Sequence, residues 1–396
     1  MFHRLRIEPT SKVEVEYDGS KLVKLTKLED GDAISPPPFS ILHLNVQTSS
    51  GKINPEDPIM MIRSICEDAS DPKQSVETLF DSKYEKDILE AFFSYVQNKD
   101  PDILVFMGDY FASTILDYLF ARTVKLELDL HLGRERNKIA QLTFLKHPGS
   151  HWIKGRLSIS NIMGNRFSSV LDKFGFAGLI ELCRFGFLPL DLAAKYGMNR
   201  LIGSRNCYEL IQRGFVIPNN ESSHHEEIRT IEELFSNDRG GMIISPQTGL
   251  HENVLVLDYD NEYANLIVNH NLSYETVLPK GKQDNKSNNK KGLLPIVVEK
   301  HLKRRLHFER LSKELPEESR EYLWCKQRID SLKNILVCLY GTTGSLWNRC
   351  GNALVFEEIN RQSREILIKT KDIVQKLGYE LIYADTDSVF IKKVIG

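Results

Sequence analysis

Two apolar runs near the end of the chain are separated by a three-residue acidic turn. In ELIYADTDSVFIKK, residues 380–393, apolar residues reach Asp385-Thr386-Asp387 and resume immediately afterwards. This pattern predicts a hairpin that packs against protein, with two carboxylates at its tip. Two like charges this close raise each other's proton affinity unless a cation neutralises them. Either the turn lies in water and the pair is idle, since Asp is common in hairpin turns, or the turn binds something positive.

A third carboxylate follows another apolar strand. Asp258 ends the run VLVL, and a helix N-cap is its plain structural interpretation. Together with Asp385 and Asp387 it would complete a set of oxygen ligands that suits Mg²⁺, or Mn²⁺ in its place, with coordination left for substrate phosphates. Two such ions about 4 Å apart can activate an attacking hydroxyl and stabilise a leaving pyrophosphate.

Basic side chains gather on two predicted helices. The stretch HLKRRLHFER contains four Lys and Arg residues, Arg305 among them, and a solvated helix face explains most of these charges. On the next helix, Lys333 and Tyr340 are seven residues apart and therefore share a face. Because Lys333 lies in the otherwise apolar SLKNILVCLYG, it needs a counter-charge, and an incoming triphosphate would provide one.

Composition restricts the class of protein. With 396 residues, the chain can bury two or three cores, and 41% hydrophobic and 27% charged residues are ordinary for a globular protein. The net charge is −2, so a polyanion would be held only by local basic patches. Six scattered cysteines without a CxxC pair favour a reducing, intracellular setting over a disulfide framework or a zinc ribbon. Neither a signal peptide nor a membrane span is recognisable.

The chain alternates between strand and helix patterns. A strand in FSILHLNVQT and a strand, loop and helix in DPDILVFMGDYFASTILDYLFAR predict an α/β domain through about residue 185. Helical patterns continue to about residue 213. The stretch KGKQDNKSNNKKG, residues 280–292, is predicted to be a polar loop. Three long helices are expected at about 295–315, 318–340 and 355–378, before the acidic hairpin.

The motifs, in this order, resemble those of family B DNA polymerases, especially their archaeal forms. DYDNEYANLI is similar to the first palm motif, in which Asp258 matches the metal-binding aspartate and Tyr263 the aromatic steric gate against a 2′-hydroxyl. YADTDS is similar to the second palm motif, in which Asp387 matches the second shared metal ligand and Asp385 the supporting carboxylate. Ala384 stands where that motif has glycine.

The basic and aromatic residues also fit this resemblance. KNILVCLYG is similar to the fingers helix through Lys333 and Tyr340, although Val337 and Cys338 replace its usual Asn-Ser. Arg305 follows Gly292 at the distance of the family's triphosphate-binding arginine. The resemblance therefore implies two overlapping residue sets: a catalytic set of Asp258, Asp385, Asp387 and Lys333, and a nucleotide-binding set of Tyr259, Tyr263, Arg305, Lys333 and Tyr340.

The exonuclease motifs expected ahead of the palm are degenerate. HLNVQT has Asn45 and Gln47 at the two acidic positions, and GDYFAS has Ala112 where an aspartate belongs. No third motif is recognisable in SISNIMGNRFSSVLD, and Asp109 alone is interpreted as a loop residue. Neutral amides and a methyl group cannot neutralise two divalent cations, so 3′–5′ proofreading is expected to be absent. The domain would then serve as a scaffold or a DNA-binding wall.

The fold implied is multidomain, α/β and α+β: an RNase H-like exonuclease domain, then an antiparallel palm sheet with helical fingers. The chain stops nine residues after Asp387, so the thumb is expected to be absent, and the chain to be a fragment or to pair with a second chain that supplies it. The expected segments are an N-terminal piece at 1–39, an exonuclease-like domain at 40–185, connecting helices and the first palm part at 186–265, fingers with flanking palm helices at 266–375, and the palm hairpin at 376–396.

The resemblance implies a DNA-directed DNA polymerase without proofreading, serving replication, repair or lesion bypass. Its partners would be primer–template DNA and deoxynucleoside triphosphates, with no membrane, in an archaeal cytoplasm at the nucleoid or otherwise in a nucleus. The alternative is a non-catalytic, polymerase-derived subunit that binds DNA or organises other proteins. The eroded exonuclease motifs favour the alternative, and the intact aspartates, Lys333 and the two tyrosines favour the enzyme.

Overall fold

The structure divides into two compact units. This computed structural model describes residues 13–18, 21–27, 34–68, 71–108, 112–129, 131–134, 151–153, 156–162, 170–217, 230–232, 240–278, 290–345 and 348–393. Unit 1 comprises Met1–Gly197 and Phe308–Ser331, and unit 2 comprises Met198–His307 and Leu332–Gly396. The predicted five-segment division stays a prediction.

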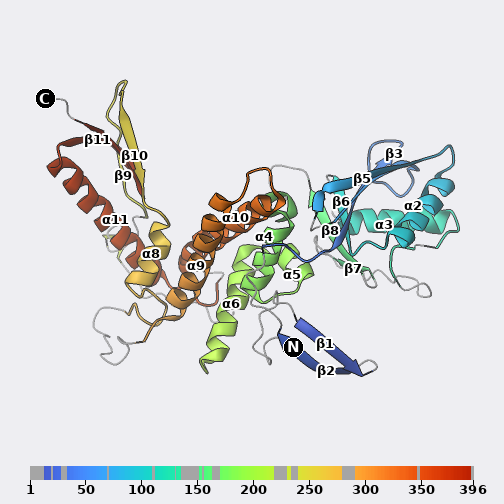
Figure 1. Ribbon diagram of the computed structural model, residues 1–396, viewed down its shortest axis with the longest axis horizontal. Coiled ribbons are helices and arrows are strands. Elements are labelled where there is room, and N and C mark those ends of the chain that lie inside the picture. The colour runs from blue at the N-terminus through green and yellow to red at the C-terminus, as the bar shows by residue number, and fades with distance from the viewer. Residues whose placement is uncertain are drawn as a thin grey trace. The chain divides into compact units, whose positions relative to one another are not determined.

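Unit 1 contains a six-stranded mixed sheet of order β5-β4-β3-β6-β8-β7 (Figure 1). Strands β3, β6 and β8 are parallel, and the remaining pairs are antiparallel. The central strand β6 reads ILVFMG, and such an apolar run is typical of a strand covered on both faces. The bounds are β3 Ser40–Thr48, β4 Ile59–Asp68, β5 Asp71–Asp81, β6 Ile103–Gly108, β7 His151–Ile153 and β8 Arg156–Ile162.

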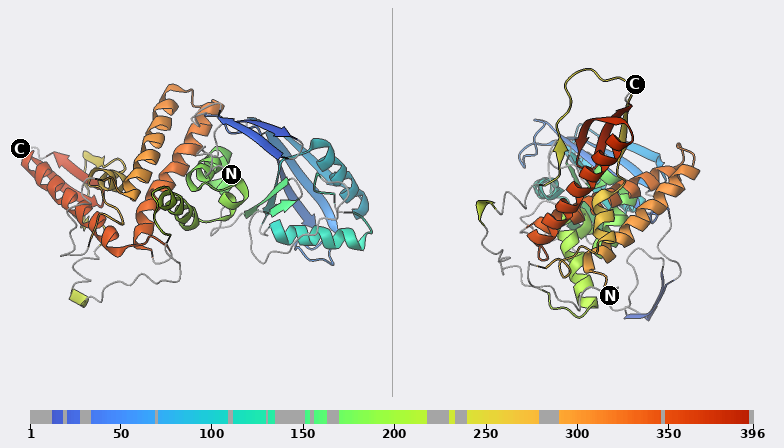
Figure 2. Two further views of the ribbon diagram at one scale, coloured as in Figure 1. Left: turned by 90° about the horizontal axis from the view of Figure 1, so that it is seen from below. Right: turned by 90° about the vertical axis from the view of Figure 1, so that its left-hand side faces the viewer.

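Helices α2 (Glu85–Lys99) and α3 (Ala112–Lys125) pack against this sheet (Figures 1 and 2). Alternate residues Leu42 and Leu44 of β3 enter the same core as Phe106 of β6. Phe92 of α2 and Leu119 of α3 pack into this core. The two-residue period of the strands and the helical spacing of α2 and α3 thus bury one common apolar face.

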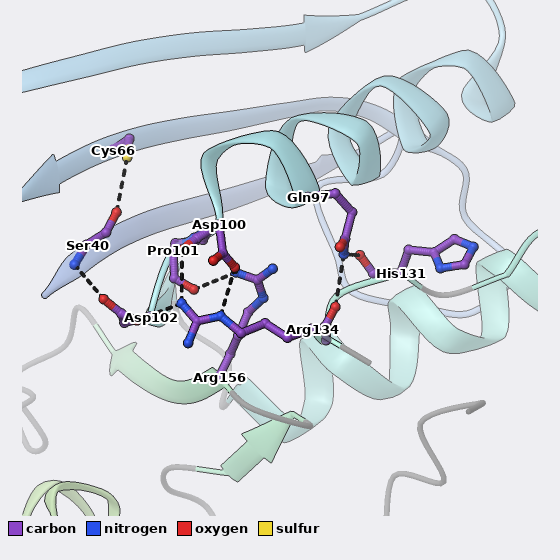
Figure 3. A network of polar contacts seen from close by, with 10 residues as sticks. Ser40, Cys66, Gln97, Asp100, Pro101, Asp102, His131, Arg134 and Arg156 are labelled. Carbon is purple, nitrogen blue, oxygen red and sulfur yellow. Dashed lines mark hydrogen bonds and ion pairs between the residues drawn. The ribbon is translucent and has the colours of Figure 1, made fainter. Parts of the chain in front are cut away.

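A charge network lies where the parallel strands begin (Figure 3). Arg134 donates from Nε to Asp100 (2.8 Å) and from Nη2 to Asp102 (2.6 Å). Arg156 is buried, donates to the Pro101 carbonyl (2.6 Å) and pairs with Asp100 (3.0 Å). The hydrogen bond from Arg134 therefore lowers the pKa of Asp100.

The rest of unit 1 is a hairpin and a helical group. Strands β1 (Val13–Asp18) and β2 (Lys21–Lys27) pair antiparallel. The helices are α4 (Val170–Gly186), α5 (Leu190–Lys195) and the parts of α9 (Leu293–Glu314) and α10 (Arg320–Gly341) that belong to this unit. Arg328 of α10 forms a buried ion pair with Glu181 of α4. Gly175 kinks α4 at φ 63°, where a Cβ would collide with Gln327.

Unit 2 contains a four-stranded antiparallel sheet of order β10-β12-β11-β9. Helix α11 (Ala353–Lys376) runs alongside β11 (Figures 1 and 2), and its Leu367 and Val374 share a core with Ala384, Val389 and Ile391 of the sheet. The strands are β9 Ile243–Ile244, β10 Val254–Asp258, β11 Tyr379–Asp385 and β12 Ser388–Lys393. Helices α6 (Met198–Gln212) and α8 (Glu262–Asn269), the 3₁₀ turn Thr342–Gly344 and the remainder of α9 and α10 complete the unit.

The mixed α/β architecture and the acidic hairpin predicted from the sequence are confirmed. Helices α9, α10 and α11 begin and end within about two residues of the predicted bounds. Most of the predicted polar loop, residues 279–289, lies outside the described residues. Within the described residues, none of the helices combines the length and the apolar character needed to cross a bilayer.

Candidate functional site

Two of the predicted aspartates share one row across the sheet of unit 2. Ser388 of β12 pairs with Asp258 of β10 on one side and with Asp385 of β11 on the other. Residues directly opposite one another in an antiparallel pair project from the same face. The next row contains Val389 and Ala384, which pack with α11. The aspartates therefore lie on the face opposite the α11 core.

The turn that carries Asp387 is held by backbone hydrogen bonds. Thr386 is left-handed, at φ 52°, and its N–H donates to the Met242 carbonyl (2.8 Å). The Tyr259 N–H donates to the Asp387 carbonyl (2.8 Å), which ties the residue after Asp258 to the turn. The structure thus brings together two segments that lie far apart in the sequence.

Gly241 makes a close approach to this turn. A Cβ on Gly241 would lie 2.6 Å from Thr386 Oγ1. The preceding Gly240 carbonyl accepts from Arg364 Nη1 of α11 (2.8 Å). A residue with a side chain at position 241 would therefore displace the acidic turn.

Asp385 has hydroxyl partners for both carboxylate oxygens. Thr386 Oγ1 donates to Oδ1 (3.0 Å), and the Tyr383 hydroxyl donates to Oδ2 (3.2 Å). These bonds orient the carboxylate and occupy part of its acceptor capacity. The supporting role that the resemblance implies for Asp385 stays a prediction.

The pKa of Asp387 is shifted by its surroundings. Burial raises its pKa, and the nearby charges of Asp258 and Asp385 raise it further. Lys333 of α10 and a backbone hydrogen bond act in the opposite direction. The structure therefore places Lys333 close to the acidic turn, but within the described residues no ion pair neutralises Asp258 or Asp387.

This donor set fits a divalent cation in part. Asp258 and Asp387 repel each other, and a cation would relieve that repulsion. Carboxylate oxygens supplemented by phosphate and water oxygens are typical of Mg²⁺ sites. Among the described residues, however, no group of three His, Cys, Asp or Glu side chains lies close enough to form a complete cage. The arrangement suits a cation held by two aspartates together with substrate oxygens.

An aromatic stack joins α8 to α10. The rings of Tyr263 and Tyr340 are parallel within 6°, with centroids 3.9 Å apart, and the ring of Phe356 also stacks on Tyr340 (5.3 Å). The Tyr340 hydroxyl donates to Asn360 Oδ1 (2.6 Å). Val337, between Lys333 and Tyr340 in the sequence, is 59% exposed. The structure thus brings the two predicted nucleotide-binding tyrosines into contact.

The remaining predicted nucleotide-binding residues have protein partners. Arg305 of α9 donates to Asn261 Oδ1, immediately before α8. The Tyr259 hydroxyl bonds to Thr370 Oγ1 of α11 (2.6 Å). Arg305 is thus near the segment that carries Tyr263, whereas Tyr259 is anchored to the helix behind the sheet.

Comparison with known proteins identifies the family. The family model for DNA polymerase family B matches residues 195–395, slightly more than half of the chain. The chain belongs to DNA polymerase family B. Every aspartate, basic and aromatic residue of the candidate site lies within the matched residues.

Individual relatives agree with this membership. DNA polymerase 2 of Saccharolobus solfataricus is 25% identical over a match that covers 54% of this chain and 33% of that protein. The DNA polymerase delta catalytic subunit of Dictyostelium discoideum is 23% identical over 98% of this chain and 44% of its own length. The family B DNA polymerase from Pyrobaculum calidifontis has the same fold, with a TM-score of 0.72 and 22% identity over all of this chain and 60% of that one. The chain thus spans about a third to three fifths of these relatives.

The structure reveals one further acidic residue near the predicted aspartates that is not predicted from the sequence. Glu262, the first residue of α8, is only 6% exposed. Burial raises its pKa to about 7, and the charges of Asp387 and Asp258 add to the effect. An acid in the first helical turn is normally a solvated residue that interacts with the helix dipole, so the sequence alone does not mark Glu262 as a buried acid. The sequence did contain one indication: Glu262 is four residues before Leu266, which is buried, so both lie on the same face of α8.

The positions predicted to be degenerate exonuclease motifs lie in unit 1. Asn45 and Gln47 are two residues apart on β3, on the face opposite Leu44 and Val46 of the core. Ala112 is the first residue of α3. Asp109 and residues 163–169 of the expected third motif lie outside the described residues. The loss of proofreading therefore stays a prediction.

Proposed function

We propose that this chain carries the polymerase site of a DNA-directed DNA polymerase that adds deoxynucleotides to a primer 3′ end. The observation that carries the proposal is the junction of Asp258 and Asp387, tied by the hydrogen bond from Tyr259 N–H to the Asp387 carbonyl. Burial and the neighbouring charge of Asp258 raise the pKa of Asp387, and no ion pair among the described residues neutralises either carboxylate. Family membership supplies the reaction class. In this proposal the sheet of unit 2 is the palm, and α9 with α10 forms the fingers.

The catalytic role of the chain's own residues follows from charge and position. Asp258 and Asp387 would hold a divalent cation, which would supply Lewis acidity for ionising the primer 3′-hydroxyl and for stabilising the leaving pyrophosphate. Asp385, fixed by two hydroxyls, orients the turn. Lys333 approaches the same turn from α10 and neutralises charge on the triphosphate as the pyrophosphate leaves.

Nucleotide selection in this proposal depends on the aromatic stack. Tyr263 is held by Tyr340, whose hydroxyl is in turn fixed by Asn360. A rigid ring beneath the sugar excludes a 2′-hydroxyl by steric overlap. Tyr263→Ala should therefore raise ribonucleotide incorporation relative to deoxynucleotide incorporation, and an unchanged ratio would reject this role.

Primer extension tests the proposal. The 396-residue chain is given a labelled primer–template, the four deoxynucleotides and Mg²⁺, with Asp258→Asn and Asp387→Asn as matched isosteric variants. Each variant should lower the extension rate by about a hundredfold or more, as loss of a charge-stabilising group typically does. Glu358→Gln on the same unit serves as the control and should extend normally. Undiminished synthesis by both aspartate variants would reject the assignment.

Unit 1 is proposed to be an exonuclease-derived domain of RNase H type without activity. Asn45, Gln47 and Ala112 supply no carboxylate at the positions where metal ligands are expected. No dose of Mg²⁺ should then produce 3′ degradation of single-stranded DNA. Degradation that survives in the polymerase-inactive Asp387→Asn variant would contradict this proposal.

One observation favours the alternative of a non-catalytic DNA-binding subunit. No complete three-ligand metal cage is present among the described residues. In that case the wild-type chain would bind primer–template DNA, measured by fluorescence anisotropy, with equal affinity in the presence of Mg²⁺ and of EDTA, and would extend nothing. Metal-dependent extension by the wild-type chain excludes this alternative.

A further inference from the structure

Glu262 is a buried acid that the proposed reaction does not yet use. It begins α8, four residues after Asp258, and the short link between them contains the N–H of Tyr259 that bonds to the acidic turn. Despite its position in the first turn of a helix, it is 6% exposed. A carboxyl group is almost never buried to this degree without a partner for its charge.

The two oxygens of Glu262 differ. Oε2 accepts a hydrogen bond from Ser363 Oγ of α11 (3.2 Å). Oε1 is equally buried and has no hydrogen-bond partner among the described residues. A buried acceptor without a donor costs free energy, so an unfilled one indicates a missing proton, water or ion.

The charged and titratable groups around Glu262 come from every neighbouring element. Burial raises the pKa of Glu262 to about 7, and the charges of Asp387 in the turn and of Asp258 on β10 add to the effect. Burial raises the pKa values of Tyr263 on α8 and Tyr340 on α10, and the charge of Glu262 raises both slightly further. These tyrosines are neutral at physiological pH. Glu262 therefore belongs to the same uncompensated acidic group as the two aspartates, and no described cation pairs with it.

We propose that Glu262 is a further acidic residue that acts on the divalent-cation site: its negative charge adds to that of Asp258 and Asp387 and strengthens cation binding without completing a three-ligand cage among the described residues. This inference rests on the proposed function, since it requires a cation between those aspartates. A divalent ion reverses the local electrostatics: the two aspartates repel a Glu262 carboxylate, whereas the ion attracts it. Ser363 holds one oxygen, and the other has acceptor capacity left for a water molecule that could link it to the ion.

Manganese binding tests the inference without reference to activity. The full 396-residue chain is titrated with Mn²⁺, and the free ion is followed by its electron paramagnetic resonance signal. Glu262→Gln keeps the shape and the hydrogen bond to Ser363 but removes the charge, and it should weaken Mn²⁺ binding by about tenfold. Glu262→Leu, an apolar residue for a buried position, should do the same. Having both variants keeps the test decisive if one of them folds poorly.

Two further variants separate the possible outcomes. Asp387→Asn should weaken Mn²⁺ binding at least as much as Glu262→Gln. Glu358→Gln removes a charge from α11 that already has Arg361 as its partner, and it should leave binding unchanged. If Asp387→Asn weakens binding but neither Glu262 variant does, the inference is overturned and the proposed function stands. If Asp387→Asn binds Mn²⁺ like the wild type, both the ligand assignment and this inference are overturned.

Discussion

Two acidic clusters, one in each unit, have opposite electrostatic environments. In unit 1, Asp100 and Asp102 face Arg134 and Arg156, and the pKa of Asp100 is lowered (Figure 3). In unit 2 the pKa of Asp387 is raised by burial and by neighbouring aspartates. A protein that only needs to fold gains nothing from uncompensated acids held together. The difference is what we expect if the first cluster belongs to the scaffold and the second binds a positive ligand, as proposed.

The most buried ion pair of the unit 1 sheet and its covering helices should show the largest effect on stability. Arg122 bonds Glu85 through Nε (2.8 Å) and Nη2, and it also donates to the Pro55 carbonyl (2.8 Å). Both side chains are under 10% exposed. Arg122→Met would leave the Glu85 carboxylate buried without a cation, at a cost of about 3–5 kcal/mol in unfolding free energy. Hydrogen–deuterium exchange of the α2 and α3 amides measures this loss within unit 1.

An exposed pair of the same sheet provides the control. Arg63 and Glu77 also form an ion pair, but both side chains are about half exposed. Arg63→Met should leave amide protection unchanged because water screens the pair. Equal losses in the two variants would show that burial is not what makes the unit 1 pairs structural.

The pH dependence of unit 2 should be the next largest effect. Glu262 has a folded pKa of about 7 against an ordinary 4.5. Because the folded value is raised, its contribution to stability is fully present below pH ~4.5 and is lost as the pH rises to ~7, a difference of about 3 kcal/mol. Glu262→Gln should therefore match the wild type at about pH 5 and be more stable at about pH 7.5 in EDTA. Exchange of the α8 and α11 amides at the two pH values measures this difference.

Glu358, a carboxyl group on α11, should show a pH dependence of stability of the opposite sign. Arg361 lowers the pKa of Glu358, so its contribution is present at neutral pH and is lost as the pH falls through the folded value. Glu358→Gln should therefore lose stability at neutral pH and approach the wild type in acid. If Glu262→Gln behaved in the same way, Glu262 would be a compensated, structural acid.

Local patterns were sufficient to predict the long elements and the hairpin. Helices α9 to α11 show helical periodicity over more than twenty residues each, and the acidic turn is bounded by apolar strands. Side-chain environments created by distant residues were not predictable. The burial of Glu262 depends on Ser363, a hundred and one residues further on, and the need for Gly241 depends on Thr386. A single sequence contains no local signal for such contacts.

A substitution at Gly241 tests whether packing positions the acidic turn. Among the described residues, no ion pair holds this turn in place. A Cβ at position 241 would lie 2.6 Å from Thr386 Oγ1, so Gly241→Ala should cost about 1–2 kcal/mol and lower Mg²⁺-dependent extension by moving Asp387. Gly203, within α6 of the same unit, has open space around its Cβ position. Gly203→Ala should instead add about 0.5–1 kcal/mol and leave extension intact. Thermal unfolding and primer extension of the two variants separate these outcomes.

The smallest effect on stability is expected at Asp387, one of the two residues proposed to bind the catalytic cation. Asp387→Asn removes a charge that Asp258 and Asp385 repel, whereas the hydrogen bond from Tyr259 to its backbone carbonyl is unaffected. In EDTA its thermal midpoint should therefore not fall, and a slight rise is expected, although primer extension is lost. Asp102→Asn in unit 1 is the matched variant: it loses an ion pair to Arg134 (2.6 Å) and weakens the bond from the Ser40 N–H (3.1 Å), so its midpoint should fall. Loss of function without loss of stability is characteristic of a residue retained for its chemistry. If Asp387→Asn instead lowered the midpoint as much as Asp102→Asn, the acids of unit 2 would be part of the scaffold, and the contrast between the two units would disappear.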